Sequence, residues 1–194
     1  MQIGKRAKVV LAFLAVLIAV QVINTFTGNS LLQHGLVPRT YSGLQGVLFA
    51  PFLHGSVRHL LSNILPLAVL SWLVMSEGVE RYIRVAVLIT VISGLLVWCA
   101  GRSSIHVGAS SLIFGLWTYL LARGWYERSL PSVVIAMFVG VFYSGLVFGF
   151  IPVPGVSFEG HVAGALAGVL TGWLMHFKAC LLYTSDAADD MQCV

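Results

Sequence analysis

The segment IHVGASSLIFG, residues 105–115, places two serines and a histidine in an otherwise apolar stretch. A serine hydroxyl becomes a good nucleophile when a neighbouring imidazole can accept its proton. Further imidazoles occur in two other segments, HGSVRHLLSN at residues 54–63 and EGHVAG at residues 159–164. Because these residue types together support acyl transfer, the simplest chemistry that we expect of them is hydrolysis of a peptide bond.

The oxygen of an attacked carbonyl gains negative charge and needs hydrogen-bond donors. His59 and Asn63 are four residues apart, so they share one face of a helix, and imidazole and amide N–H groups can both donate. The backbone N–H groups of Ala109 and Ser110 stand at a predicted helix start, where such groups lack intrahelical partners. A nucleophile, a base and oxyanion donors are therefore all available in these segments.

The composition indicates a membrane protein. Of the 194 residues, 58% are hydrophobic and 9% are charged, whereas roughly a quarter of the residues of a soluble domain are charged. We therefore expect one domain embedded in a lipid bilayer. The basic residues are few and scattered, which argues against nucleic-acid binding. The three cysteines show no paired spacing, and we expect neither a metal ion nor another cofactor.

Six apolar segments approach the roughly 20 residues that a membrane-spanning helix needs. They comprise residues 9–26, 57–75, 83–100, 109–124, 130–150 and 161–177. We expect an all-α bundle, in which residues 1–8 are a cytoplasmic N-terminus and residues 9–178 form the membrane domain. Residues 179–194 are acidic and polar and resemble a translated sequencing adapter, so we expect a non-native, disordered tail there.

The distribution of Lys and Arg predicts the orientation in a bacterial plasma membrane. With the N-terminus in the cytoplasm, eight of these residues lie in inner segments and three in outer ones, as the positive-inside rule requires. The polar residues of the second, fourth and sixth helices then share one depth near the outer surface: His54, His59, Asn63, Ser110, Ser111 and His161. Polar groups inside a bilayer are costly and tend to be paired or functional, so we expect a site that opens outward.

Small residues indicate how two of the helices approach each other. One stripe comprises Gly160, Gly164, Gly168 and Gly172, and a second comprises Gly108, Ser111, Gly115, Thr118 and Ala122. Small residues at this spacing allow helix backbones to approach closely. We expect contact between the stripes to bring Ser110 and Ser111 to His161. The alternative interpretation of the stripes is a helix-packing seam with no chemical role.

These motifs resemble those of the rhomboid intramembrane serine proteases, over roughly residues 9–178. HGSVRHLLSN, GASS with LIFG, and EGHVAGALAG resemble the family's motifs on the second, fourth and sixth helices, in the same order. The resemblance implies a six-helix bundle with a membrane-embedded loop between helices 1 and 2, and single-span transmembrane proteins as substrates. It also implies roles for five residues: Ser110 as nucleophile, His161 as general base, and His59, Asn63 and Ala109 in the oxyanion hole.

One residue departs from the family pattern, because Ser111 stands where a glycine usually follows the nucleophile. A hydroxyl there can pack, crowd the site or compete as nucleophile, and the motif favours Ser110. An alternative function is that of a catalytically inactive relative that binds client transmembrane helices, and a small transporter or channel is a third. We expect His54 to support a loop or a helix start, and Glu159 to be a solvated loop residue.

Overall fold

The structure is a computed structural model that describes the backbone of residues 2–186 and the side chains of residues 3–177. This part of the chain is all-α, as predicted. The long helices are α1 (Gln2–Phe26), α3 (Val57–Val74), α4 (Val79–Ala100), α5 (Ser110–Glu127), α6 (Leu130–Phe142) and α7 (Phe158–Asp186). The shorter elements are α2 (Gly46–Phe49), η1 (Ser30–His34), η2 (Ser42–Gln45), η3 (Ala50–Phe52), η4 (Met75–Glu77) and η5 (Ser144–Phe150).

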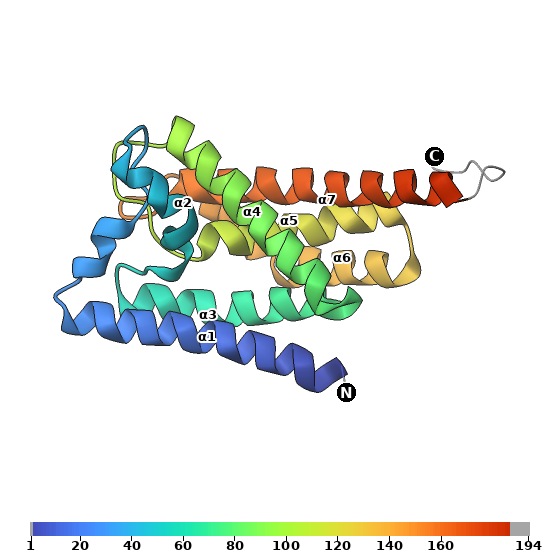
Figure 1. Cartoon of the computed structure of the whole chain (residues 1–194), viewed down its shortest axis with the longest axis horizontal. Helices are drawn as coiled ribbons and strands as arrows, with labels where there is room; N and C mark the ends of the chain where they lie inside the picture. Colours follow the sequence, from blue (N-terminus) through green and yellow to red (C-terminus); the bar gives the residue numbers. More distant parts are fainter. Residues whose placement is uncertain (1, 187–194) are drawn as a thin grey trace.

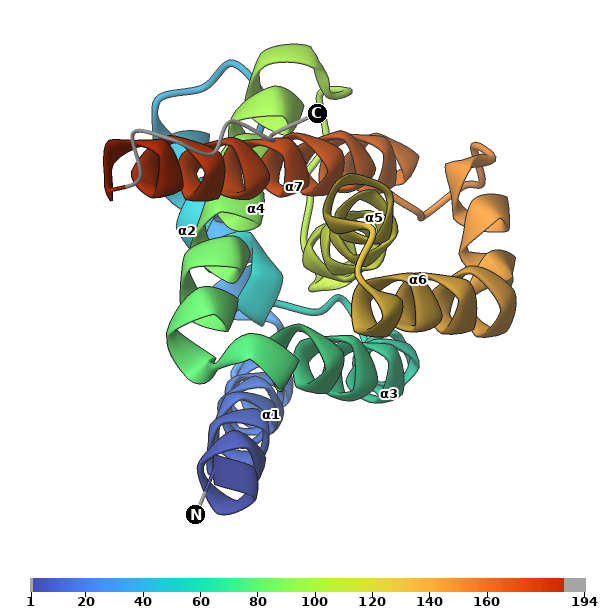
Figure 2. The same ribbon diagram turned by 90° about the vertical axis from the view of Figure 1, so that its right-hand side faces the viewer.

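Helix α5 lies at the centre of the bundle, with α3, α4, α6 and α7 around it (Figure 2). Eleven of its 18 residues are buried, and Leu116 and Leu120 are among the most deeply buried residues of the chain. Leu67 of α3 and Ile89 of α4 belong to the same apolar core. Residues at the first turn of α5 are therefore approached by several helices at once.

Helix α7 runs beside α5 because small residues face each other along the contact (Figure 1). A Cβ atom on Gly164 would collide with the carbonyl oxygen of Ser111, and one on Gly168 would collide with that of Gly115. The Thr118 hydroxyl donates a hydrogen bond of 2.8 Å across the seam to a carbonyl of α7. The predicted contact between the two small-residue stripes is present.

The connection between α1 and α3 folds against α4 at one end of the bundle (Figure 1). Val47 of α2 rests on Gly94 of α4, where a Cβ would come within 2.8 Å of a Val47 methyl group. Arg39 donates a hydrogen bond of 2.9 Å to the Gly101 carbonyl, and the Trp98 indole donates one of 2.9 Å to the Thr40 carbonyl. The connection is thus a built part of the fold, and its embedding in a membrane stays a prediction.

Three boundaries differ from the predicted ones by more than four residues. Helix α1 begins at Gln2, so residues 2–8 continue the first helix, because no helix-breaking proline separates them from it. Within the predicted span 130–150 the α-helix ends at Phe142, and the 3-10 helix η5 that follows is bent by 60° relative to α6. Helix α7 continues to Asp186, so the disorder expected from residue 179 is not found as far as Asp186. Residues 187–194 of the expected tail lie outside the described residues.

Some of the described helices have the length and composition of membrane spans. By length and composition, Ile3–Phe26, Val57–Glu77 and Val79–Ala100 could each cross a membrane, and the bent pair α6–η5 adds a fourth if it counts as one span. Helix α5 carries serines at one end and Arg123 and Glu127 at the other, which makes it less apolar, but it lies inside the bundle. Large apolar side chains are exposed on the outer helices, as helices that face lipid require.

Candidate active site

Ser110 and His161, which we call the dyad, are in contact at the end of the bundle that holds the α1–α3 connection. Ser110 is the first residue of α5, and His161 lies in the first turn of α7. His161 Nε2 is 3.0 Å from Ser110 Oγ, and His161 is 8% exposed. The close approach of α5 and α7 brings together two side chains that are 51 residues apart in the sequence.

The Gly149 carbonyl determines which nitrogen of His161 carries the proton. His161 Nδ1 is 2.7 Å from this oxygen, and since a carbonyl can only accept, Nδ1 must donate. In the neutral ring Nε2 is then an acceptor, and it faces the Ser110 hydroxyl. Phe114 stacks on the imidazole with ring centroids 4.2 Å apart and an interplanar angle of 3°. His161 is therefore held, without a carboxylate, in the tautomer whose Nε2 can accept a proton.

Gly149 lies outside the motifs that predict the site, and Phe114 lies inside one of them, LIFG, without a predicted role. Gly149 reaches His161 only because η5 bends away from α6. A Cβ at Gly149 would collide with the Phe114 ring and lie 3.0 Å from His161 Nδ1. A glycine between two phenylalanines, in the sequence FGF, is the only local signal of this close approach.

His59 and Asn63 extend from α3 toward the backbone of Gly108, two residues before Ser110. Gly108 has φ of +119°, a conformation that favours glycine, and a Cβ there would lie 2.6 Å from His59 Cε1. Asn63 is 5% exposed, and its Nδ2 has no hydrogen-bond partner within the part of the chain that the structure describes. A buried unpaired donor costs about 1–3 kcal/mol. The site therefore contains an N–H donor that lacks an acceptor.

The structure differs from the prediction at Ala109, whose backbone N–H is already engaged. It donates a hydrogen bond of 3.4 Å to His54 Nε2, so it is not a free oxyanion donor. His54 is fully buried just before α3, and its ring centroid is 5.0 Å from that of His59. His54 thus supports the start of α5, in keeping with the expected role. The N–H of Ser110, at the start of α5, is among the backbone donors that have no intrahelical acceptor there.

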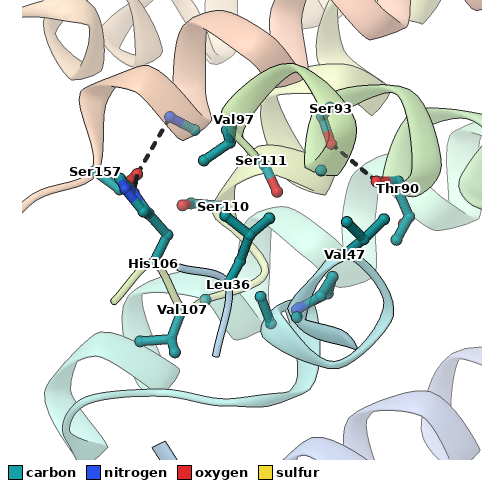
Figure 3. Close-up of a pocket in the computed structure, with 16 residues that line it drawn as sticks. Leu36, Val47, Thr90, Ser93, Val97, His106, Val107, Ser110, Ser111 and Ser157 are labelled. Carbon is teal, nitrogen blue, oxygen red and sulfur yellow. Dashed lines mark hydrogen bonds between the residues drawn. The ribbon is translucent and has the colours of Figure 1, made fainter. Parts of the chain in front are cut away.

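A small cavity of about 30 Å³ lies beside Ser110 (Figure 3). Its lining includes Leu36, Val47, Thr90, Ser93, Val97, His106, Ser110, Ser111 and Ser157. The hydroxyls of Ser110 and Ser111 point in different directions (Figure 3). Among the described residues only the Ser110 hydroxyl contacts the His161 ring, and none hydrogen-bonds that of Ser111. This geometry favours Ser110 as the nucleophile.

A second histidine–serine contact joins the same two segments at the edge of the cavity (Figure 3). His106 Nδ1 is 2.6 Å from Ser157 Oγ, while His106 Nε2 is 3.0 Å from the Arg102 carbonyl and must donate to it. His106 Nδ1 therefore accepts from the Ser157 hydroxyl. The Arg102 side chain forms an ion pair with Glu159, so this carboxylate contacts an arginine instead of being fully solvated.

Comparison with known proteins identifies the family of this chain. The Rhomboid domain family matches residues 41–178. An uncharacterised protein of Mycobacterium tuberculosis is 37% identical over 176 residues, which cover 86% of this chain and 73% of the relative. Rhomboid-like protein 11, chloroplastic, of Arabidopsis thaliana is 29% identical over 141 residues, or 65% of this chain and 50% of the relative. The chain, with its bundle of apolar helices, belongs to the rhomboid family of multi-pass membrane proteins.

Proposed function

We propose that this protein is an intramembrane serine endopeptidase in which Ser110 attacks a peptide carbonyl. The observation that carries the proposal is the 3.0 Å contact between Ser110 Oγ and His161 Nε2. Because Nδ1–H is bound to the Gly149 carbonyl, Nε2 is the nitrogen that can take the serine proton. Membership of the rhomboid family supports the same chemistry.

In the first step a bond forms between Ser110 Oγ and the substrate carbonyl carbon, while the hydroxyl proton passes to His161 Nε2. The Gly149 carbonyl stabilises the resulting imidazolium through its hydrogen bond to Nδ1–H. The carbonyl oxygen becomes an oxyanion, and it accepts hydrogen bonds from the unpaired amide of Asn63, from His59 and from the N–H of Ser110. The positive N-terminal end of α5 adds to this stabilisation.

In the second step the carbon–nitrogen bond breaks, and His161 Nε2–H donates its proton to the leaving amine. The acyl group is then an ester of Ser110. A water molecule attacks this ester, gives one proton to His161, and the Ser110 oxygen recovers that proton as the acid product leaves. The cavity beside Ser110 has room for about two water molecules and is lined by several hydroxyls.

The proposed substrates are single-span transmembrane proteins, cut near the outer face of a bacterial plasma membrane. The excess of Lys and Arg in the inner segments supports this orientation, with the N-terminus in the cytoplasm. The carbonyl groups of a regular helix are bonded to N–H groups four residues later. A substrate helix that unwinds easily near its outer end therefore presents its carbonyls more readily to Ser110.

Cleavage of a single-span test substrate in proteoliposomes tests the proposal. Ser110→Ala is expected to lower the cleavage rate at least about 10³-fold, because the nucleophile is removed. Ser111→Ala is the matched control, and we expect it to keep at least about a third of the rate, since its hydroxyl does not contact the imidazole. Full activity of Ser110→Ala would exclude Ser110 as nucleophile.

The alternative is an inactive relative that binds client transmembrane helices, and the feature in its favour is Ser111 in place of the usual glycine. A fluorophosphonate probe reacts with activated serines, so it separates the two functions. Labelling of the wild type, with loss of labelling in Ser110→Ala, supports the protease. An unlabelled wild-type protein that still binds a transmembrane helix supports the alternative.

A further inference from the structure

A crevice of about 430 Å³ lies at the end of the bundle opposite the dyad. There the first turns of α1 lie beside the corner between α3 and α4 (Figures 1 and 2). The charged residues of its lining are Lys5, Arg6, Glu77, Glu80, Arg81 and Arg84. Since this end faces the cytoplasm in the proposed orientation, the crevice lies at the depth of the inner lipid headgroups.

Two of these charged residues, Glu77 and Arg81, belong to an internal ion cluster. Arg81 lies 2.6 Å from a carboxylate oxygen of Glu77 and 2.7 Å from one of Glu127. Arg123 pairs with the same two carboxylates, so the two bases and two acids of the cluster neutralise one another. The remaining charged residues of the crevice are Lys5, Arg6, Arg84 and Glu80. Three positive charges and one negative charge leave a formal charge of +2, which favours an anion.

Exposed apolar side chains are present on both helices that form the walls of the crevice. Ile3 and Leu11 are exposed on α1, and Ile83 and Val87 are exposed on α4. A ligand that is anionic at one end and apolar at the other matches this arrangement. We propose that the crevice binds the phosphate headgroup of an anionic phospholipid, whose acyl chains lie against α1 and α4.

The two walls of the crevice make little direct contact with each other, because α1 packs mainly on α3. Arg6 donates a hydrogen bond of 2.9 Å to the Ser76 carbonyl, which ties α1 to the corner before α4. Lys5 lies on one wall and Arg84 on the other, so their like charges disfavour the approach of α1 to α4. A bound phosphate removes this repulsion, and the lipid therefore stabilises the attachment of α1.

Native mass spectrometry of the whole protein in a neutral detergent tests the proposal by titration with phosphatidylglycerol or phosphatidylcholine. We expect phosphatidylglycerol to bind at least about fivefold more tightly than phosphatidylcholine. Lys5→Gln and Arg84→Gln should each weaken phosphatidylglycerol binding by about fivefold, because this is the typical contribution of one basic residue to the affinity for an anionic lipid. Glu80→Gln should strengthen it, because the acid of the crevice is removed. Arg128→Gln is the matched control, and its affinity should not change.

Equal affinity for the two lipids would overturn the proposal. An equal loss of affinity in Arg128→Gln would also overturn it, since that result indicates attraction to the overall charge of the protein. Displacement of phosphatidylglycerol by an equal concentration of inorganic phosphate would assign the crevice to a free anion instead of a lipid. None of these measurements requires proteolysis, so their outcome is distinguishable from a failure of the proposed function.

Discussion

His106 Nδ1 lies 2.6 Å from Ser157 Oγ, and this contact repeats the dyad contact four residues earlier on both segments. We call His106 and Ser157 the upstream pair. In the dyad the segment at the start of α5 provides the serine and the segment at the start of α7 provides the histidine, whereas in the upstream pair these residue types are exchanged. Because α7 begins directly after Ser157 and α5 begins four residues after His106, the hydrogen bond between these two residues helps to hold the two helix starts together. The geometry of the dyad thus depends partly on a contact outside the long helices.

Loss of the upstream pair should slow cleavage without removing a reacting group. In His106→Ala we expect the rate constant kcat to fall about tenfold or more with KM little changed, because small displacements of reacting groups are costly. Ser157→Ala should behave alike, and the double variant should be no worse than either single one, since both lose the same bond. Ser104→Ala is the control, as its hydroxyl lies 3.3 Å from the other nitrogen of the ring. Additive losses in the double variant would contradict the role of the pair.

Removal of the unpaired amide of Asn63 should affect activity and stability in opposite ways. We expect Asn63→Ala to lower kcat by about 10²–10³, the effect of losing one oxyanion donor. The melting temperature should stay the same or rise, because a buried N–H without a partner is removed. Ser62→Ala on the exposed side of α3 is the control. An unchanged kcat in Asn63→Ala would exclude the amide from transition-state binding.

A methyl group added in the α5–α7 seam should destabilise the bundle. Gly164→Ala places Cβ against the carbonyl oxygen of Ser111, and we expect a loss of about 1–3 kcal/mol in the free energy of unfolding, with a lower cleavage rate. Gly140→Ala on α6 is the matched control, because its Cβ would lie at an ordinary distance of 3.6 Å from a Leu121 methyl. Thermal unfolding in detergent measures both. Equal stability of the two variants would show that the seam tolerates a wider separation.

His54 should make the protein less stable in mild acid. Burial, together with the charge of the nearby His59, lowers the pKa of His54 from 6.5 to about 4. Between these values the unfolded chain binds a proton that the folded chain does not, so the contribution of His54 is complete above pH 6.5 and falls as the pH drops toward 4. The slope is at most about 1.4 kcal/mol per pH unit. Thermal unfolding should show that the free energy of unfolding falls less between pH 7 and pH 5 in His54→Gln than in the wild type. An identical fall in the two proteins would contradict this role of His54.

The sequence alone determined much of the helical framework and the meeting of α5 with α7. Apolar runs of membrane-spanning length are local properties, and each of the six predicted segments overlaps one of the long helices. The two stripes of small residues also predicted which helices approach closely, since a backbone can come near only where side chains are absent. Ser110 and His161 stand beside these stripes, so their proximity could be inferred before any coordinates.

Only the tertiary structure decided the details around the dyad. The bend after α6 brings the Gly149 carbonyl to His161, and His54 takes the N–H of Ala109 that the sequence left available for an oxyanion. These contacts join residues that are 12 and 55 positions apart. The packing and turning of distant segments decides which residues form these hydrogen bonds. Neither hydrophobic periodicity nor motif spacing carries that information, because each describes one segment at a time.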